Sequence, residues 1–322
     1  MKKLKDVLNK PVNLADQMVL IGIFLAFLYW GLESLLNVFS PEEVNIYRQL
    51  FGPNVSEIWM RLIVLCLFLI FGSHVQYTIN KRKIAEQALL DSYRKLQNAR
   101  MTTILGLAKL AEYRDEGTGA HLERIREYAK IIAEALAKNP KYENIITPEY
   151  IDDIYQSSIL HDIGKVGIPD AILLKPDKLT DAEFAVIKRH TLLGGDAIKA
   201  IEYQIEGKSF LKMGREIAYN HHEKWDGSGY PEGLKGESIP LSARIVALAD
   251  VYDALTTERF YKPAYSHEKS RQIIIDLNAT HFDPAIVDVF LQLEDDFDKI
   301  REEQFKEDTG WIELPAHAMG TT

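Results

Sequence analysis

Five histidines after residue 100 fall at helical or helix-terminal positions in the sequence pattern. They are His121, His161, His190, His221 and His222. His161 is followed at once by Asp162, and Asp250 lies in the run SARIVALADVYDAL. Imidazole and carboxylate groups bind iron, manganese, zinc or nickel. The pattern therefore predicts a metal centre without thiolates, because the single cysteine lies in a distant apolar run.

Adjacent ligands on one helix cannot clasp a single ion symmetrically. Neighbouring side chains point about 100 degrees apart, so a His-Asp or His-His pair suits two adjacent ions. We expect Asp162 to bridge two cations and Asp250 to close the cluster from the other side. A carboxylate among apolar neighbours, as at Asp250, is costly to bury unless a cation compensates it. A lone histidine would more often be a hydrogen-bonded or surface residue, but five in one region favour a site.

Two such cations would support the hydrolysis of a phosphate ester. Ions about 3.5–4 Å apart lower the pKa of a bridging water and hold hydroxide in line with phosphorus. Lys165 lies four residues after His161, so its ammonium is expected on the same side, stabilising the phosphate or the departing oxygen. The alternative for Lys165 is a solvated position at a helix end.

The elements that must position these residues are helical. Start signals occur at Thr147 before Pro148, at Thr180 with Glu183, at Ser242, and at Asp283 before Pro284. No convincing alternating strand pattern separates them. We predict an all-α bundle of about seven helices over residues 100–302. A long glycine-containing loop lies before Ser242, and a tail covers 303–322.

The first eighty residues contain two apolar runs, at 18–39 and 58–77. Each is about the ~20 residues that a membrane-spanning helix needs. Glu33 is expected near the outer interface or shielded between the two helices. The alternatives are buried helices of a soluble domain, or a cleaved signal peptide. The second is disfavoured because no small-residue cleavage site follows the first run.

The flanking charges predict the orientation of these spans. Lysines populate segment 1–17, and Lys81, Arg82 and Lys83 follow the second run, whereas the short loop 40–57 holds one arginine against three glutamates. Positive charge favours the cytoplasmic side, so both ends are expected there. A net charge of −9 argues against a partner that is a long nucleic acid.

Segment 78–99 is rich in helix formers and carries Leu89, Tyr93 and Leu96 at helical spacing. This stripe predicts either a signalling helix that pairs two chains or a linker helix packed on the next domain.

The longer motifs resemble a known family. HDIGK at 161–165 resembles the signature of HD-superfamily phosphohydrolases, and HHEKWDGSGYP at 221–231 resembles the motif of the HD-GYP subfamily. YRDEGTGAHLER at 113–124 and RIVALADVYDALTTERFYK at 244–262 resemble the same family, so the resemblance covers about 100–290. It implies that the five histidines with Asp162 and Asp250 are metal ligands, and it favours iron or manganese.

The resemblance also implies a substrate, cyclic di-GMP, hydrolysed to the linear dinucleotide and in some members onward to GMP. By motif match, the substrate contacts would be Gly229, Tyr230, Asp253, Arg259 and Lys262. Arginine suits this role because its planar fork bonds phosphate oxygens or a guanine edge in pairs. Loop packing is the alternative for Tyr230, and a structural role within the helix is the alternative for Asp253.

One departure from the family concerns the number of metals. Some members carry a glutamate one helical turn before the first ligand histidine, and it helps to hold a third ion. Here that position is Gly117, and Glu116 is turned away by about a quarter of a turn. We therefore expect two ions. Two rival functions stay open: hydrolysis of another cyclic dinucleotide such as cyclic GMP-AMP, and an idle domain that binds the nucleotide or a partner protein.

Overall fold

The computed structural model describes residues 12–38, 55–114, 120–204, 209–258 and 263–308, with side chains to residue 303. The chain forms two compact units, residues 1–99 and 100–322. Within the described ranges every regular element is a helix, so the all-α prediction is confirmed.

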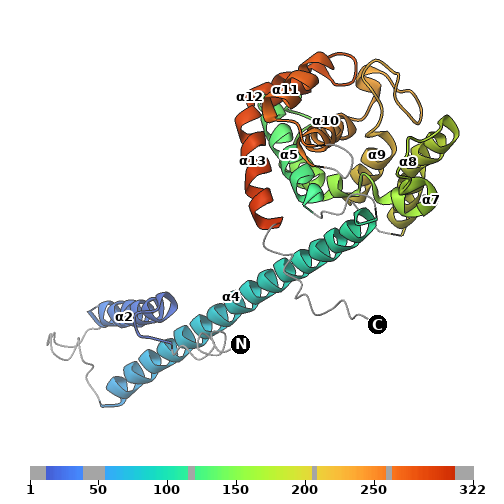
Figure 1. Ribbon diagram of the computed structural model, residues 1–322. Helices are drawn as coiled ribbons and strands as arrows, with labels where there is room; N and C mark the ends of the chain where they lie inside the picture. The colour runs from blue at the N-terminus through green and yellow to red at the C-terminus, as the bar shows by residue number, and fades with distance from the viewer. Residues whose placement is uncertain (1–11, 39–54, 115–119, 205–208, 259–262, 309–322) are drawn as a thin grey trace, which may run out of the picture. The chain divides into compact units, whose positions relative to one another are not determined.

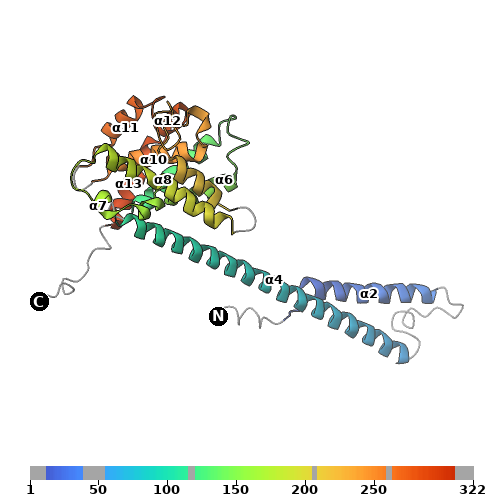
Figure 2. The same ribbon diagram turned by 90° about the vertical axis from the view of Figure 1, so that its right-hand side faces the viewer.

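The first unit pairs two apolar helices. Helix α2 (Gln17–Val38) lies alongside the first part of α4 (Val55–Glu112), as Figure 2 shows. A Cβ added at Gly22 would lie 2.6 Å from the Phe68 carbonyl oxygen, and one at Gly72 would lie 2.6 Å from that of Met18. The two backbones therefore touch, which is typical of packing between helices in a bilayer. Both helices are long and apolar enough to cross a membrane.

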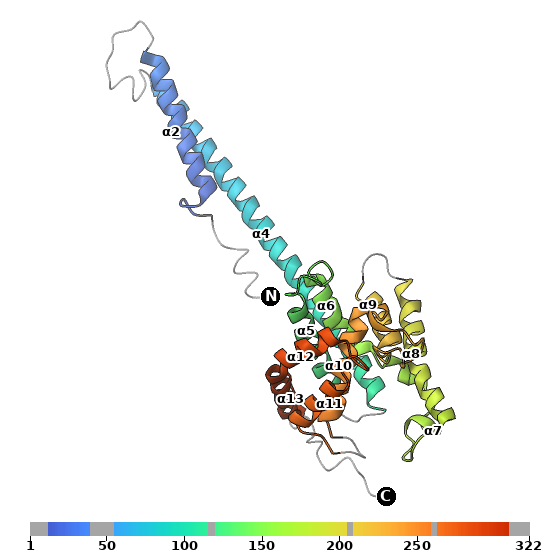
Figure 3. The same ribbon diagram turned by 90° about the horizontal axis from the view of Figure 1, so that it is seen from above.

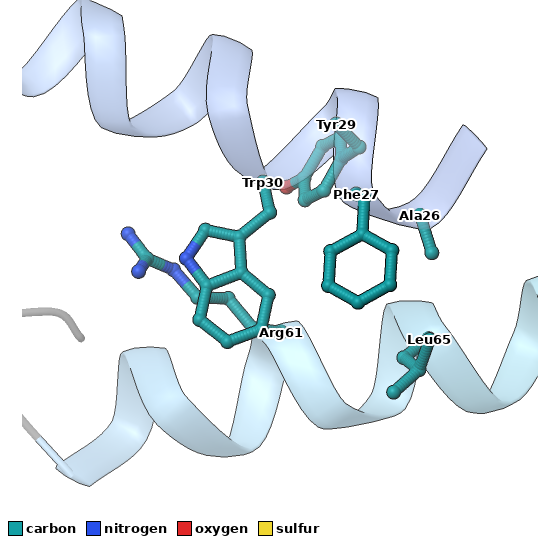
Figure 4. Close-up of a pocket in the computed structure, with 6 residues that line it drawn as sticks. All are labelled: Ala26, Phe27, Tyr29, Trp30, Arg61 and Leu65. Atoms are coloured by element: carbon teal, nitrogen blue, oxygen red, sulfur yellow. The ribbon is translucent and has the colours of Figure 1, made fainter. Parts of the chain in front are cut away.

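A charged pair lies between these two helices. Arg61 donates to Glu33 at 3.1 Å, and its guanidinium lies 5.5 Å from the centroid of the Trp30 ring. Only 5% of Arg61 is exposed. Figure 4 shows a pocket beside Arg61, which is lined by Ala26, Phe27, Tyr29, Trp30, Arg61 and Leu65. Glu33 is thus shielded between the helices, one of the two positions expected for it.

Helix α4 continues without a break through the second apolar run and segment 78–99, and it ends at Glu112. Its 58 residues contain no proline, so no backbone amide is missing from its hydrogen-bond ladder. Leu89, Tyr93 and Leu96 are 70%, 59% and 67% exposed.

The second unit is a helical bundle around α5 and α10. These two helices lie in its middle, with α11, α12 and α13 on one side and α8 and α9 on the other (Figures 1 and 3). The helices that follow α4 among the described residues are α5 (His121–Leu136), α6 (Pro148–Ser157), α7 (Asp170–Leu173), α8 (Asp181–Glu202), α9 (Leu211–Asn220), α10 (Leu241–Thr256), α11 (His267–Asp276), α12 (Pro284–Gln292) and α13 (Glu294–Asp308). The bundle exceeds the expected seven helices because short ones such as α7 leave little periodic signal. Tyr128, Tyr252, Phe290 and Phe297 pack their rings together in the core.

Three of the four predicted helix starts are confirmed. Thr147, Thr180 and Asp283 each accept a backbone N–H at the beginning of a helix, and Thr180 with Glu183 forms a complete capping box. The prediction for Ser242 was wrong, because α10 begins at Leu241 and Ser242 is buried within its first turn. Helix α13 also runs to Asp308, six residues into the expected tail.

Candidate metal centre

Four of the predicted ligands form one group. Asp162, His190, His221 and His222 each offer an atom, and these four atoms lie within 4.8 Å of one another. Nε2 of His190 lies 3.1 Å from Oδ1 of Asp162, and Nε2 of His221 lies 3.5 Å from the same oxygen. These predicted ligands come from the residue that precedes the 3-10 helix η2 (Ile163–Gly167), from α8 and from the end of α9, so three separate segments converge here.

The other three predicted ligands form a second group beside the first. Ligand atoms of His121, His161 and Asp250 again lie within 4.8 Å of one another. Nε2 of His121 is 3.7 Å from Oδ1 of Asp250, and Nε2 of His161 is 4.0 Å from that oxygen. Because the predicted ligands separate into two compact groups, the arrangement can hold two cations.

Asp162 faces both groups. Its Oδ1 points to His190 and His221, and its Oδ2 lies 3.4 Å from Nε2 of His161. Lys165 follows on the short 3-10 helix η2 (Ile163–Gly167), and its Nζ lies 2.9 Å from the same Oδ2. The carboxylate thus faces both groups of predicted ligands, and the Lys165 ammonium lies beside it.

Two glycines bring the HDIGK segment directly against α8. A Cβ added at Gly164 would lie 1.9 Å from the carbonyl oxygen of His190 and 2.4 Å from the amide nitrogen of Gly194. Only a residue without a Cβ fits there. The backbones that carry His161, Asp162 and His190 are therefore in direct contact.

Three imidazoles are oriented by the backbone of their own helical turns. Nδ1 of His161 bonds the carbonyl oxygen of Ser158 at 2.9 Å. Nδ1 of His190 bonds that of Ile187 at 2.7 Å, and Nδ1 of His221 bonds that of Ile217 at 3.0 Å. A proton on Nδ1 leaves Nε2 as the lone-pair donor, which is the usual way in which an outer partner fixes a ligand histidine.

His121 is oriented differently, by a buried side chain. Its Nδ1 lies 2.6 Å from Oδ2 of Asp253, and the Arg124 guanidinium donates to both Asp253 oxygens. Asp253 is 1% exposed and Arg124 is 2% exposed. This buried carboxylate bonds His121 and Arg124, which favours the structural role within the helix that the sequence left open for Asp253.

Burial and neighbouring charge set the protonation of the ligands. Burial lowers the pKa of His222 well below its ordinary value, and burial also lowers the pKa of His221, so both rings are neutral at neutral pH. Burial would raise the pKa of the Asp162 carboxyl, but Lys165 and His161 outweigh it and hold that pKa well below its usual range. Neutral imidazole and ionised carboxylate are the forms that bind cations.

The donor set fits divalent cations. Within the described residues, Nε2 of His161 is buried and has no hydrogen-bond partner, although its Nδ1 is bonded. A buried nitrogen of this kind is costly unless something binds it. A cation held by His161 and its neighbours would satisfy it.

The sequence reasoning missed two residues near the site. Glu112, the last residue of α4, places Oε1 3.6 Å from Nε2 of His121 and is 8% exposed. Arg114 donates to the carbonyl oxygens of Lys165, Val166 and Ile168, and so holds the segment that follows the ligands. Both precede a run of residues outside the described ranges, and no helical spacing connects them to the histidines.

The loop after His222, residues 223–234, contains the Gly-Tyr-Pro sequence and is called the GYP loop here. Sequence reasoning also missed Glu223, which holds this loop. Its carboxylate accepts the backbone N–H groups of residues 232, 233 and 234, and it is 2% exposed. Tyr230 stacks on His222 with ring centroids 4.8 Å apart. A Cβ on Gly229 would lie 2.3 Å from the amide nitrogen of Lys224, so this glycine permits a close backbone approach.

Several predictions fall on residues outside the described ranges. Arg259 and Lys262 lie in 259–262, and Glu116 and Gly117 lie in 115–119. Their predicted roles stay predictions.

Comparison with known proteins identifies related sequences. The family described as "HD domain" matches residues 106–286, more than half of the chain. A cyclic di-GMP phosphodiesterase of Vibrio cholerae is 53% identical over 213 residues, which cover 65% of this chain and 43% of the relative. A probable cyclic di-GMP phosphodiesterase of the same organism is 44% identical over 238 residues, which cover 73% and 54%. A third V. cholerae relative, the 3'3'-cGAMP-specific phosphodiesterase 2, is 38% identical over 198 residues, which cover 62% and 35%. The chain thus spans about half or less of these relatives' own length.

Proposed function

Because the chain belongs to the HD domain family, we propose that it is a metal-dependent phosphodiesterase that hydrolyses cyclic di-GMP to the linear dinucleotide, with GMP as a further product. The observation that carries the proposal is the pair of ligand groups that share Asp162. Names of relatives support a cyclic dinucleotide as the substrate.

We assign a separate role in binding or catalysis to each group of residues. The five histidines with Asp162 and Asp250 would hold two ions, iron or manganese, and these would supply a nucleophile from water and positive charge for the phosphate oxygens. Lys165 is placed to donate a hydrogen bond to a phosphate oxygen or to the departing oxygen. Arg259 and Lys262 are proposed to hold phosphate or guanine. Tyr230 forms a wall of the site through its contact with His222.

The test uses the full chain in detergent, loaded with iron or manganese under reducing, anaerobic conditions. We expect conversion of cyclic di-GMP to the linear dinucleotide. Asp162→Ala should lose both the metal and at least about a thousandfold in rate, because it removes the shared ligand. Asp288→Asn, at an exposed carboxylate on α12, is the matched control. A protein with about two ions per chain that leaves cyclic di-GMP intact would contradict the proposal.

Two other functions are distinguished by simple measurements. Faster hydrolysis of cyclic GMP-AMP than of cyclic di-GMP would identify the former as the substrate, in line with the cGAMP-specific relative. Nucleotide binding without turnover of either would favour an idle module that senses the nucleotide or binds a partner.

We further propose that α2 and residues 58–77 of α4 anchor the chain in the inner membrane, with both ends cytoplasmic. The Arg61–Glu33 pair supports this, because paired charges between helices cost far less in a bilayer than isolated ones. Cysteines introduced at Asn45 and Thr321 test the orientation. An impermeant maleimide added to intact cells should label only the first.

Pairing of two chains through segment 78–99 is proposed on the exposure of Leu89, Tyr93 and Leu96. An apolar helical stripe of this kind favours a two-stranded coiled coil. Light scattering of the detergent-solubilised chain should give a dimer mass, and replacement of the three residues by glutamate should give a monomer.

A further inference from the structure

Helix α8 carries an aromatic ring and a cation on one face. Phe184 and Lys188 are one turn apart, so their side chains lie side by side. Nζ of Lys188 lies 4.8 Å from the centroid of the Phe184 ring. It also lies 5.1 Å from the centroid of the Tyr230 ring, which comes from the GYP loop.

These three residues adjoin the metal centre. Tyr230 stacks on the ligand His222, with ring centroids 4.8 Å apart. The ring of Phe184 meets that of Tyr230 edge to face, with centroids 6.3 Å apart. A continuous row of rings therefore leads from His222 through Tyr230 to Phe184. The Lys188 ammonium lies over the rings of Tyr230 and Phe184.

The outer end of this row is open. Phe184 is 44% exposed, although a large aromatic side chain is normally buried. Among the residues that the structure describes, Lys188 has no carboxylate within ion-pair distance, and its ammonium is balanced by ring faces alone. An exposed ring beside a cation without a carboxylate partner is a suitable surface for a purine.

The chemistry of this surface favours guanine over adenine. Nucleobases stack on aromatic side chains whatever their sequence. A lysine ammonium bonds O6 and N7 of guanine, whereas adenine offers a donor amino group at the corresponding position. The ring would thus hold either purine, and the ammonium would select between them.

We propose that Phe184 and Lys188 form a guanine subsite beside the metal centre, with Tyr230 as its inner wall. The subsite rests on the proposed function, because it assigns a base of the nucleotide substrate to a place on α8. It also gives Lys188 a role beyond keeping Tyr230 in position. A purely structural lysine would affect guanine and adenine substrates equally.

The test compares Phe184→Ala and Lys188→Met in the full, metal-loaded chain, using cyclic di-GMP and cyclic di-AMP. Lys188→Met should raise KM for cyclic di-GMP about tenfold and leave KM for cyclic di-AMP within about twofold. Phe184→Ala should raise KM for both about tenfold. Lys199→Met and Leu192→Ala, exposed positions on the same helix, are the matched controls.

Equilibrium dialysis with GMP and AMP provides a readout that does not need turnover. Wild type should bind GMP more tightly than AMP, and Lys188→Met should remove most of that preference. Absence of hydrolysis together with this binding pattern would count against the proposed function and support the subsite. Equal losses for GMP and AMP in Lys188→Met, or no loss in either variant, would overturn the subsite. Circular dichroism spectra matching wild type establish that the variants are folded.

Discussion

The two ligand groups of the metal centre are built by different means. In the group of Asp162, His190, His221 and His222, the oriented imidazoles bond backbone carbonyl oxygens three or four residues earlier in the chain. In the group of His121, His161 and Asp250, His161 is held by a backbone carbonyl in the same way, but His121 instead depends on the buried Asp253 and Arg124. The first arrangement follows from helix geometry, whereas the second needs two buried charges from distant parts of the chain.

This difference predicts which ion is lost first. A backbone carbonyl cannot be removed by substitution, so the first group should tolerate changes in its surroundings. A buried ion pair is fragile, because removing one partner leaves the other charge uncompensated. The group around His121 should therefore be the sensitive half of the site.

The largest effect is expected from Asp253→Asn. Arg124 would lose its anionic partner, so the free energy of unfolding should fall by about 3 kcal/mol or more. The affinity of one metal site should fall about 10–100-fold, because His121 loses its orienting carboxylate. Manganese titration by calorimetry should resolve one weakened and one intact site, with Asp288→Asn as the control. Equal weakening of both sites would contradict the contrast between the two groups.

The same pair makes stability depend on pH. Burial would raise the pKa of Asp253, but Arg124 and His121 outweigh it and hold the pKa below its ordinary value. A carboxyl with a lowered folded-state pKa stabilises the fold above its unfolded pKa of about 3.9, and this stabilisation is lost as pH falls through the folded value. Denaturant unfolding should be measured between pH 6 and 3. The difference in unfolding free energy between wild type and Asp253→Asn should become smaller below about pH 4. A difference in unfolding free energy that becomes larger below pH 4 would show that the ionised Asp253 carboxylate does not stabilise the fold.

A smaller effect is expected from Glu223→Gln, which tests the group of Asp162, His190, His221 and His222. Glu223 directly follows His222 and accepts three backbone N–H groups of the GYP loop. Loss of the charge should lower the free energy of unfolding by about 1–3 kcal/mol. Metal affinity should stay within about twofold, because His221 is held by the backbone of α9. Loss of an ion in this variant would show that the backbone anchors are not sufficient.

The smallest effect is expected from Glu112→Gln. Its Oε1 lies 3.6 Å from Nε2 of His121, so its charge favours a cation in the sensitive half. We expect affinity at that one site to fall a few-fold, below the roughly 10–100-fold typical of an orienting partner. Metal analysis after dialysis against graded chelator measures this, and Glu123→Gln on α5 is the control. A loss as large as that of Asp253→Asn would make Glu112 a ligand in its own right.

The sequence was sufficient for what is local. Some features are encoded by residues that are neighbours in the sequence. Examples are the adjacent predicted ligands His161 and Asp162, the capping box at Thr180 and the two apolar runs. Periodicity and residue type report such features directly. The all-helical fold follows from the same information.

What the sequence could not reveal depends on contacts between distant residues. Arg124 and Asp253 are 129 residues apart, so no spacing connects them, and the motif left Asp253 open between a substrate contact and a structural role. Glu112 lies at the end of α4 and His121 at the start of α5, so their contact depends on tertiary structure and not on spacing along one helix. Ser242 failed as a helix start because it follows Pro240 and Leu241, and the helix begins one residue earlier.

The contact at Gly164 has a consequence for how this centre can change over evolutionary time. Because backbone touches backbone there, no side chain acts as a spacer between the segments that carry Asp162 and His190. Substitution elsewhere in the core can exchange one apolar residue for another without altering that separation. The separation between the backbones that carry Asp162 and His190 is thus set by the dimensions of the polypeptide itself, whereas the exposed Phe184 can be substituted without altering it.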